Sequence, residues 1–232
     1  MTGPRQQLSL PFPINQRFVL GNFEIGENAE VVQRLEAEPD RSVFSGLWLW
    51  GGGAVGVSHL LHGVCHWHAA RGARVAYLPL GAVERDPAVL EGLDFYDLLA
   101  LDDVEVWAGD LQLESPLMAM YERLFARRAR LIVGAAGPAA RCGFRLADLA
   151  SRLSSLTAYE VRPLNDEGKV RLLRRLAKER GLELSDAVLG YWLARSHRSV
   201  RRLLDDLEVI DAEAMRAQRV VTIPLLKDAL GL

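Results

Sequence analysis

The sequence lacks any apolar run close to the roughly 18 to 20 residues that a membrane-spanning helix needs. Its two cysteines, Cys65 and Cys142, lie far apart without metal-binding spacing. It also lacks a surplus of positive charge, because 28 Lys and Arg oppose 30 Asp and Glu, for a net charge of −2. These absences argue against a membrane protein, a disulfide scaffold, a metal site and a protein that grips nucleic acid by itself through many phosphate contacts. With no charged-then-apolar leader either, we expect a cytoplasmic protein.

Short apolar runs alternate with helical patterns through the middle of the chain, which is typical of a mostly parallel sheet flanked by helices. After Pro163 every segment has helical periodicity instead. We therefore predict an N-terminal peptide over residues 1–14, an α/β domain over 15–163 and a small all-helical domain over 164–232, whose first helix is capped by Asn165 or Asp166. The expected strands are 47–50, 75–80, 98–101, 131–135 and 157–161. The expected helices are 57–70, 86–93, 114–128 and 145–154, followed by 166–180, 185–196, 198–216 and 222–230.

The N-terminal residues 6–13 read Gln-Gln-Leu-Ser-Leu-Pro-Phe-Pro. The two prolines favour an extended backbone, which lowers the entropy cost of docking. Leucine and phenylalanine side chains suit an apolar pocket, and a glutamine amide suits its polar rim. This is the makeup of a peptide that binds a DNA polymerase sliding clamp, and its contact residues would be Gln7, Leu8, Ser9, Leu10, Pro11 and Phe12. The alternative is an apolar tail folded onto its own domain.

The first expected strand runs into the glycine-rich segment Trp-Gly-Gly-Gly-Ala-Val-Gly-Val-Ser-His, residues 50–59. Its G-x-x-x-x-G-x-S spacing is that of a phosphate-binding loop, in which backbone amides and a helix N-terminus meet a polyphosphate. Val57 stands where such loops carry a lysine. The backbone and the Ser58 hydroxyl could therefore hold a diphosphate, whereas a γ-phosphate would lose its main charge partner. The alternative is a purely structural glycine turn.

The third expected strand ends in two carboxylates, Asp102 and Asp103. An apolar strand that delivers carboxylates to the carboxyl edge of a sheet resembles a Walker B element, with Asp102 near a magnesium ion and Asp103 near an attacking water. A helix N-cap is the alternative for Asp103. The end of the fourth strand, 134–138, offers no polar side chain. We therefore predict that the chain turns over little ATP of its own.

Taken together, the order of these motifs resembles the AAA+ module of the DnaA family of replication initiators. The resemblance includes the regulatory members that inactivate the initiator after replication starts, and it covers essentially the whole chain. The segments that carry it are 22–28, 51–59, 98–103, 148–153, 198–201 and 221–227, together with the N-terminal peptide. It implies an α/β AAA+ domain with a five-stranded, mostly parallel sheet, followed by a helical lid. We expect no counterpart of the family's DNA-reading domain, and contact with DNA only through partners.

The resemblance also implies a site for ADP or another adenine nucleotide. Residue by residue, the positions that match are Phe23, Gly51, Gly53, Gly56, Val57, Ser58, His59, Asp102, Asp103 and Arg201. Because Val57 removes the lysine charge, we expect nucleotide binding to be weakened, and whether magnesium takes part stays open.

In AAA+ assemblies an arginine of one subunit reaches the γ-phosphate held by its neighbour. Arg152 matches that arginine finger, so the resemblance implies that this chain activates ATP hydrolysis by DnaA, bound together with the β sliding clamp. Association with the nucleoid would then come through the clamp, and self-association into a homo-oligomer stays open. Two alternatives remain: an AAA+ adaptor or loader, and a clamp-tethered structural module with a degenerate nucleotide site. For Arg152 itself, the alternative is an ordinary surface arginine.

Overall fold

A computed structural model describes residues 12–196, 199–217 and 220–232. Its chain divides into two compact units. The first holds the chain up to Phe23 together with Asn28–Gly52 and Gly56–Val161, and the second holds Glu24–Glu27, Gly53–Val55 and Arg162–Leu232. Each unit has its own hydrophobic core.

The first unit is built on one sheet whose five strands are all parallel, in the order β2-β3-β4-β1-β5. The strands are β1 (Ser45–Trp50), β2 (Val75–Pro79), β3 (Leu98–Asp102), β4 (Arg130–Ala135) and β5 (Thr157–Glu160). This confirms the predicted sheet. Because the strands are parallel, the segments that follow β1, β3 and β4 meet at the same edge, where α/β proteins bind ligands.

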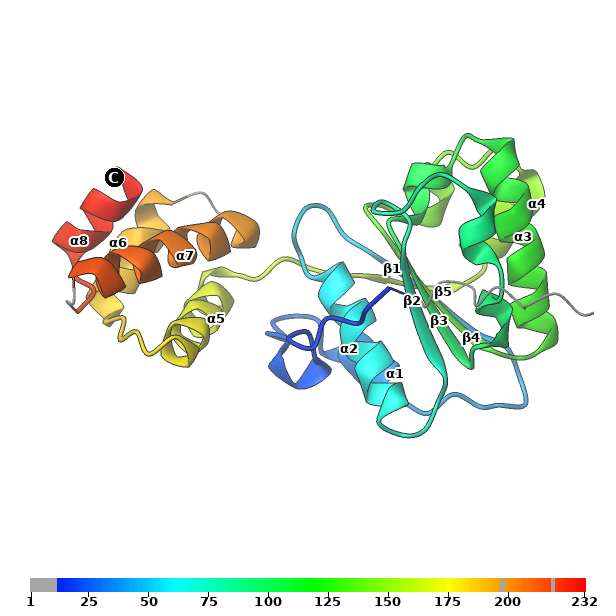
Figure 1. The fold of residues 1–232 in the computed structure, drawn as a ribbon, viewed down its shortest axis with the longest axis horizontal. Coiled ribbons are helices and arrows are strands. Elements are labelled where there is room, and N and C mark those ends of the chain that lie inside the picture. Colours follow the sequence, from blue (N-terminus) through cyan, green and yellow to red (C-terminus); the bar gives the residue numbers. More distant parts are fainter. Residues whose placement is uncertain (1–11, 197–198, 218–219) are drawn as a thin grey trace, which may run out of the picture. The chain divides into compact units, whose positions relative to one another are not determined.

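Four α-helices cover the two faces of the sheet (Figure 1). Helices α1 (Ala29–Glu36) and α2 (Val57–Ala69) lie on one side, and α3 (Leu111–Ala126) and α4 (Ala147–Ser154) lie on the other. Five short 3-10 helices join these elements: η1 (Leu20–Asn22), η2 (Pro87–Leu90), η3 (Leu93–Phe95), η4 (Val104–Trp107) and η5 (Ala139–Arg141).

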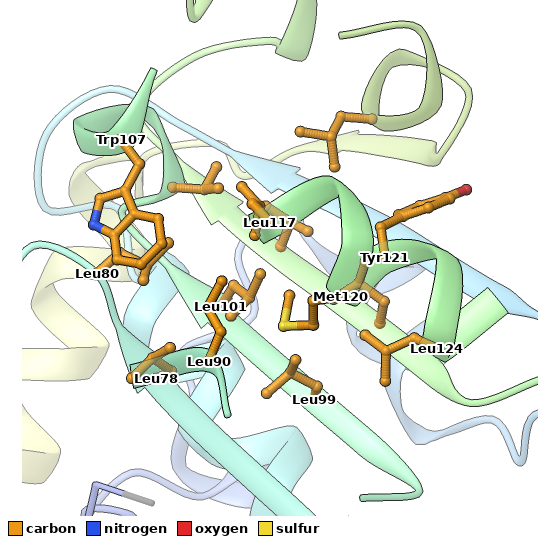
Figure 2. Packing of buried hydrophobic residues seen from close by; sticks show 14 of the residues in the cluster. Leu78, Leu80, Leu90, Leu99, Leu101, Trp107, Leu117, Met120, Tyr121 and Leu124 are labelled. Carbon is orange, nitrogen blue, oxygen red and sulfur yellow. The ribbon is translucent and has the colours of Figure 1, made fainter. Parts of the chain in front are cut away.

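The core beneath α3 includes leucines of β3 that face one side of that helix. Figure 2 shows Leu99 and Leu101 of β3 directed towards Leu117 and Met120 of α3. Tyr121 lies at the margin of this cluster with its hydroxyl directed away from it (Figure 2). One face of α3 is thus fixed against the sheet, while the residues on its opposite face are left for the surface.

In the first unit, one predicted helix does not form and one helix that is present was not predicted. The helix predicted over 86–93 is wrong: the segment forms only the 3-10 turn η2. Pro87 opens this turn, the Asp86 carboxylate accepts from Ala88 N, and Gly92 ends the segment in the left-handed region with φ 77°. A glycine in that conformation stops a helix, so no α-helix can run through to residue 93. Helix α1, which the sequence analysis did not predict, buries Val31, Val32 and Leu35.

The second unit is entirely helical. It contains α5 (Asp166–Glu179), α6 (Asp186–Arg195), α7 (Val200–Ala217) and α8 (Ile223–Leu230). The Asn165 side chain accepts a hydrogen bond from Gly168 N at 2.8 Å, which confirms Asn165 as the cap of α5. The core of the second unit centres on Trp192, Leu207 and Ile210, which are fully buried. Within the described ranges, no helix is both long enough and apolar enough to cross a bilayer.

Candidate functional site

The glycine loop lies directly after β1, where its backbone can approach a ligand. Gly51 N donates to Ala135 O at 3.2 Å and so fastens the start of the loop to the end of β4. Gly53 and Gly56 both have left-handed backbones, with φ 71° and 102°. A Cβ on Gly56 would lie 2.7 Å from the Phe23 ring, so only glycine fits there. Because these positions carry no side chain, a phosphate group could approach the backbone amides of the loop closely.

Helix α2 begins at Val57, with Gly56 as its N-cap, and the first intrahelical bond joins Leu60 N to Gly56 O at 3.0 Å. The amides of Val57 and Ser58 precede that bond, in the first turn where the backbone N–H groups of a helix have no intrahelical acceptor. The Ser58 side chain is exposed beside them. This chain therefore has the backbone donors and the hydroxyl that a diphosphate needs.

His59 and Phe23, two of the expected nucleotide-site residues, pack against each other beside the loop. Their rings meet edge to face with centroids 5.4 Å apart, and Phe18 stacks on His59 at 4.8 Å. His59 Nε2 lies 3.1 Å from Val19 O and 3.0 Å from Asn22 Oδ1. The imidazole thus fixes the entry segment onto α2, and Phe23 is held against the loop.

At the position of the missing lysine, the Val57 side chain lies close to Gly134 of β4 and to the Asp102 carboxylate. A Cβ on Gly134 of β4 would lie 2.9 Å from Val57 Cγ1 and 2.7 Å from Asp102 Oδ1. The valine methyl, the backbone of β4 and the Asp102 carboxylate therefore converge at one point. A lysine there would place an ammonium beside a carboxylate and the phosphates, whereas valine supplies only van der Waals contact.

Asp102 is buried at the end of β3, with 3% of its surface exposed. Tyr77 Oη donates to its Oδ2 at 2.8 Å, and Asp103 N donates to its Oδ1 at 3.1 Å. Burial, followed by the adjacent Asp102 carboxylate, raises the pKa of the Tyr77 hydroxyl, which keeps that hydroxyl a donor. A carboxylate with two donors keeps lone pairs for one further ligand, so Asp102 and Ser58 are the residues that would hold magnesium.

Asp103 follows in a left-handed backbone conformation, with φ 54°. Asp103 occupies the N-cap position of η4, as the alternative interpretation had it, but its side chain makes no capping hydrogen bond. Loss of hydration, followed by the negative charges of Asp102 and Glu105, raises the pKa of the Asp103 carboxyl.

Two polar residues at this edge were missed by the sequence analysis. Tyr77 lies on β2, and its contact with Asp102 depends on the register that pairs Pro79 with Asp102. Glu105 Oε1 accepts from Ala136 N at 3.0 Å, within the segment 134–138 that has no polar side chain of its own. Glu105 Oε2 is buried and lacks a hydrogen-bond partner within the described ranges. The spacing Asp-Asp-x-Glu was the available sequence signal for Glu105.

The expected arginine finger, Arg152, lies on α4, whose opposite face is fixed by the buried Leu149 and Leu153. Its side chain lines a cavity of about 360 Å³ between α3 and α4, together with Met118, Glu122, Asp148, Ser151 and Ser155. Burial raises the pKa of Tyr121, and the nearby Arg152 charge opposes that shift. In the part of the chain that the structure describes, the Arg152 guanidinium makes no hydrogen bond or ion pair. It is a charged group held at a hollow surface with its donors available.

In the second unit, Arg201 is exposed near the start of α7. Its neighbour Arg202 pairs with Asp206 at 3.1 Å, and the buried Asp206 also accepts from Ser196 Oγ at 3.2 Å. Glu24 is joined to this unit through Arg171 at 2.8 Å. Arg198 and residues 7–11 of the N-terminal peptide lie outside the described residues, and Phe12 is 40% exposed. Over the described ranges, no three His, Cys, Asp or Glu side chains are grouped so that they could hold a metal ion.

A parallel five-stranded sheet with a glycine loop after β1, paired carboxylates at the end of β3 and a following helical unit is the fold of an AAA+ module. Residues 166–230 match the family model described as the lid domain of Hda. The second unit is thus similar to the lid domain of Hda, and the fold of the chain is similar to those of the structures that follow.

Three solved structures illustrate the likeness of the fold. Domain III of the Thermotoga maritima replication initiation protein DnaA gives a TM-score of 0.80 at 18% identity, over 94% of this chain and 98% of that one. AMPPCP-bound DnaA from Aquifex aeolicus gives 0.73 at 21% identity, over 88% and 68%. The Thermotoga maritima RuvB Holliday junction branch migration motor gives 0.65 at 14% identity, over 94% and 69%.

Proposed function

We propose that this chain is a negative regulator of chromosomal replication initiation. It binds the DNA polymerase sliding clamp through residues 7–12 and supplies Arg152 to DnaA, where the guanidinium stabilises negative charge on the γ-phosphate of ATP held by DnaA. The observation that carries the proposal is the exposure of Arg152 at a cavity without a carboxylate or carbonyl partner among the described residues. An arginine with its donors available can meet phosphate oxygens of another molecule in a bidentate manner.

The cavity around Arg152 also supports a protein partner. Met118 and Glu122 of α3 and Asp148 of α4 line the same cavity as Arg152, so an apolar side chain and two carboxylates share that surface with it. Such a mixture can orient an approaching surface while leaving the arginine accessible. Because AAA+ subunits meet side by side, DnaA would bring its ATP to this face.

The clamp is expected to make this activity conditional. Changing both Gln7 and Phe12 to alanine should raise the concentration needed for half-maximal stimulation of DnaA-bound ATP hydrolysis at least about tenfold, because a pocket would lose a buried phenylalanine worth about 1.5–3 kcal/mol. The measurement is phosphate release from ATP pre-bound to DnaA, with clamp loaded on DNA. Arg5→Ala, which changes a residue outside the proposed contact residues 7–12, is the matched control. Equal stimulation by the double variant would refute clamp tethering through residues 7–12.

The chain's own glycine loop is proposed to hold ADP weakly, as a ligand that orders the module and is not turned over. Its backbone amides and Ser58 would bind the diphosphate, and Asp102 would join Ser58 in holding magnesium, which neutralises phosphate charge when bound.

Val57→Lys is expected to tighten binding of a non-hydrolysable ATP analogue about tenfold or more, because a hydrogen bond to a charged group contributes about 1.5–3 kcal/mol. Isothermal titration calorimetry of both ADP and the analogue provides the comparison. Val57→Met extends the side chain to a similar length without charge, so it should leave both affinities near the wild-type values. If lysine and methionine act alike, the loop does not hold phosphates in the proposed way.

A further inference from the structure

The amino ends of the strands lie at the edge of the sheet opposite to the glycine loop, and a cluster of arginines and exposed phenylalanines gathers there. We call it the α3-end patch and define it as Arg41, Phe95, Phe125, Arg127 and Arg128. All five side chains are exposed, Phe95 to 63% and Phe125 to 51%. None of them takes part in the proposed contacts with nucleotide, clamp or DnaA.

One aromatic ring in the patch is already paired with an arginine. The Arg127 guanidinium carbon lies 5.5 Å from the centroid of the Phe95 ring, and its Nη2 donates to Phe95 O at 3.5 Å. Asp94 and Arg123 form an ion pair at 3.5 Å that joins η3 to α3. The Phe95 ring is therefore positioned beside positive charge while much of its face stays in water.

The second ring, Phe125, packs against the ring of Phe44, with their centroids 5.2 Å apart. Phe44 also meets Tyr121 edge to face at 5.3 Å. An aromatic pair beneath it holds Phe125 at the surface without covering it.

Arg128 is present at a backbone position that favours glycine. It follows α3 with φ 57°, its N–H bonds to Phe125 O at 3.0 Å, and Ala129 N bonds to Leu124 O at 3.0 Å. This is the left-handed ending of a helix, where most side chains are strained and glycine is preferred. A long charged side chain kept at such a position points to a use for that charge.

Carboxylates near the patch offset only part of its positive charge: a hydrogen bond from Arg74 is the main cause that lowers the pKa of the Asp97 carboxyl, and the Arg41 charge helps to lower it, so Arg41 and Asp97 lie near each other. Asp97 accepts from Arg74 at 2.8 Å and 3.2 Å, and Asp94 is held by Arg123. Among the described residues, neither Arg127 nor Arg128 forms an ion pair. The net charge of −2 averages over the whole chain and conceals this local surplus.

We propose that the α3-end patch binds single-stranded nucleic acid, with phosphates on Arg41, Arg127 and Arg128 and a base stacked on Phe95. Arginines interleaved with exposed aromatic faces are the chemistry that sequence-independent single-strand sites use. An acidic peptide would satisfy the arginines but would leave the phenylalanine faces without a partner. Duplex DNA would likewise leave them unused, because its bases are stacked on one another. The binding can be weak and still matter, since a clamp tethered on DNA would hold the patch at a high effective concentration of nucleic acid.

The test is fluorescence anisotropy of a labelled oligothymidylate with the isolated chain at low ionic strength, so that neither clamp nor DnaA is needed. Phe95→Leu keeps an apolar side chain but removes the flat face, and it should weaken binding at least about fivefold. Arg128→Gly should weaken binding and lower the salt dependence, by about 0.7 in the slope of log K against log salt for each phosphate that the protein no longer neutralises.

Arg128→Gly also separates function from folding, because relief of the left-handed strain should raise the urea midpoint while binding falls. Arg141→Ala, an exposed arginine after β4 at the other edge of the sheet, is the matched control and should bind like the wild type. The proposal is overturned if the chain does not bind oligothymidylate, if Phe95→Leu and Arg128→Gly leave binding unchanged, or if duplex DNA or polyglutamate binds as tightly as the single strand.

Discussion

Arg152→Ala is expected to reduce the stimulated hydrolysis of ATP on DnaA by about 10³-fold or more, because arginine fingers contribute about 10³–10⁵ to phosphoryl transfer in related systems. The charge on the γ-phosphoryl oxygens grows in the transition state, so the guanidinium acts on the rate more than on binding. The side chain is exposed and α4 is anchored by Leu149 and Leu153, so the fold should not change. The maximal rate at saturating protein is the decisive quantity.

Two further variants make this result specific. Arg145→Ala removes an exposed arginine just before the same helix and should leave the maximal rate unchanged. Arg152→Lys keeps the charge but loses the planar, bidentate donor geometry, so it should recover only a small part of the rate. A maximal rate near wild type for Arg152→Ala would show that Arg152 does not act on ATP, and would favour an adaptor without a catalytic contribution.

Much of the fold follows from local sequence patterns. Strands β1 to β4 are short, largely apolar and mostly buried runs, whereas β5 is largely exposed. The helices of the second unit show one apolar side each, so their periodicity is visible without tertiary information. The glycine loop was also recognisable, because Gly53 and Gly56 adopt conformations that other residues avoid.

The elements that the sequence did not reveal depend on interactions with distant residues. Helix α1 has only eight residues and includes adjacent β-branched Val31 and Val32, which gives it little intrinsic stability. Its last turn is completed by Arg130, a residue of β4. In the candidate site, Asp102 was predicted at the sheet edge, but its donor Tyr77 lies on another strand, and sequence spacing carries no information about that register.

Arg130 itself is a buried cation without a carboxylate partner among the described residues. It has 3% of its surface exposed, and its guanidinium donates to the carbonyl oxygens of Arg34 at 2.9 Å, Leu35 at 3.3 Å and Ala37 at 3.0 Å. Burial, followed by the charge of Arg34, lowers the pKa of Arg130 to about 10. The carbonyls at the end of α1 carry partial negative charge, which is what holds the cation there.

His68 completes the same cluster. Its Nε2 lies 2.6 Å from Arg130 Nη1, which is a donor, and 3.1 Å from Leu35 O, which is an acceptor. Burial is the main cause that lowers the pKa of His68, and the Arg130 charge acts in the same direction. The residue that completes the last turn of α1 therefore also disfavours a charged imidazole on α2.

Arg130→Met is expected to lower the free energy of unfolding by about 3 kcal/mol, because methionine fills much of the space but leaves several buried carbonyls without donors. The substitution also removes a buried charge, whose desolvation is unfavourable. The net loss in the free energy of unfolding should therefore be smaller than the sum of the lost hydrogen bonds. Urea unfolding at neutral pH measures the change. Arg74→Ala removes an exposed, solvent-screened arginine just before β2 and should leave the urea midpoint nearly unchanged. A loss for Arg130→Met as small as that of Arg74→Ala would mean that water or a shift of α1 satisfies the carbonyls, and that the cation does not hold the helix to the sheet.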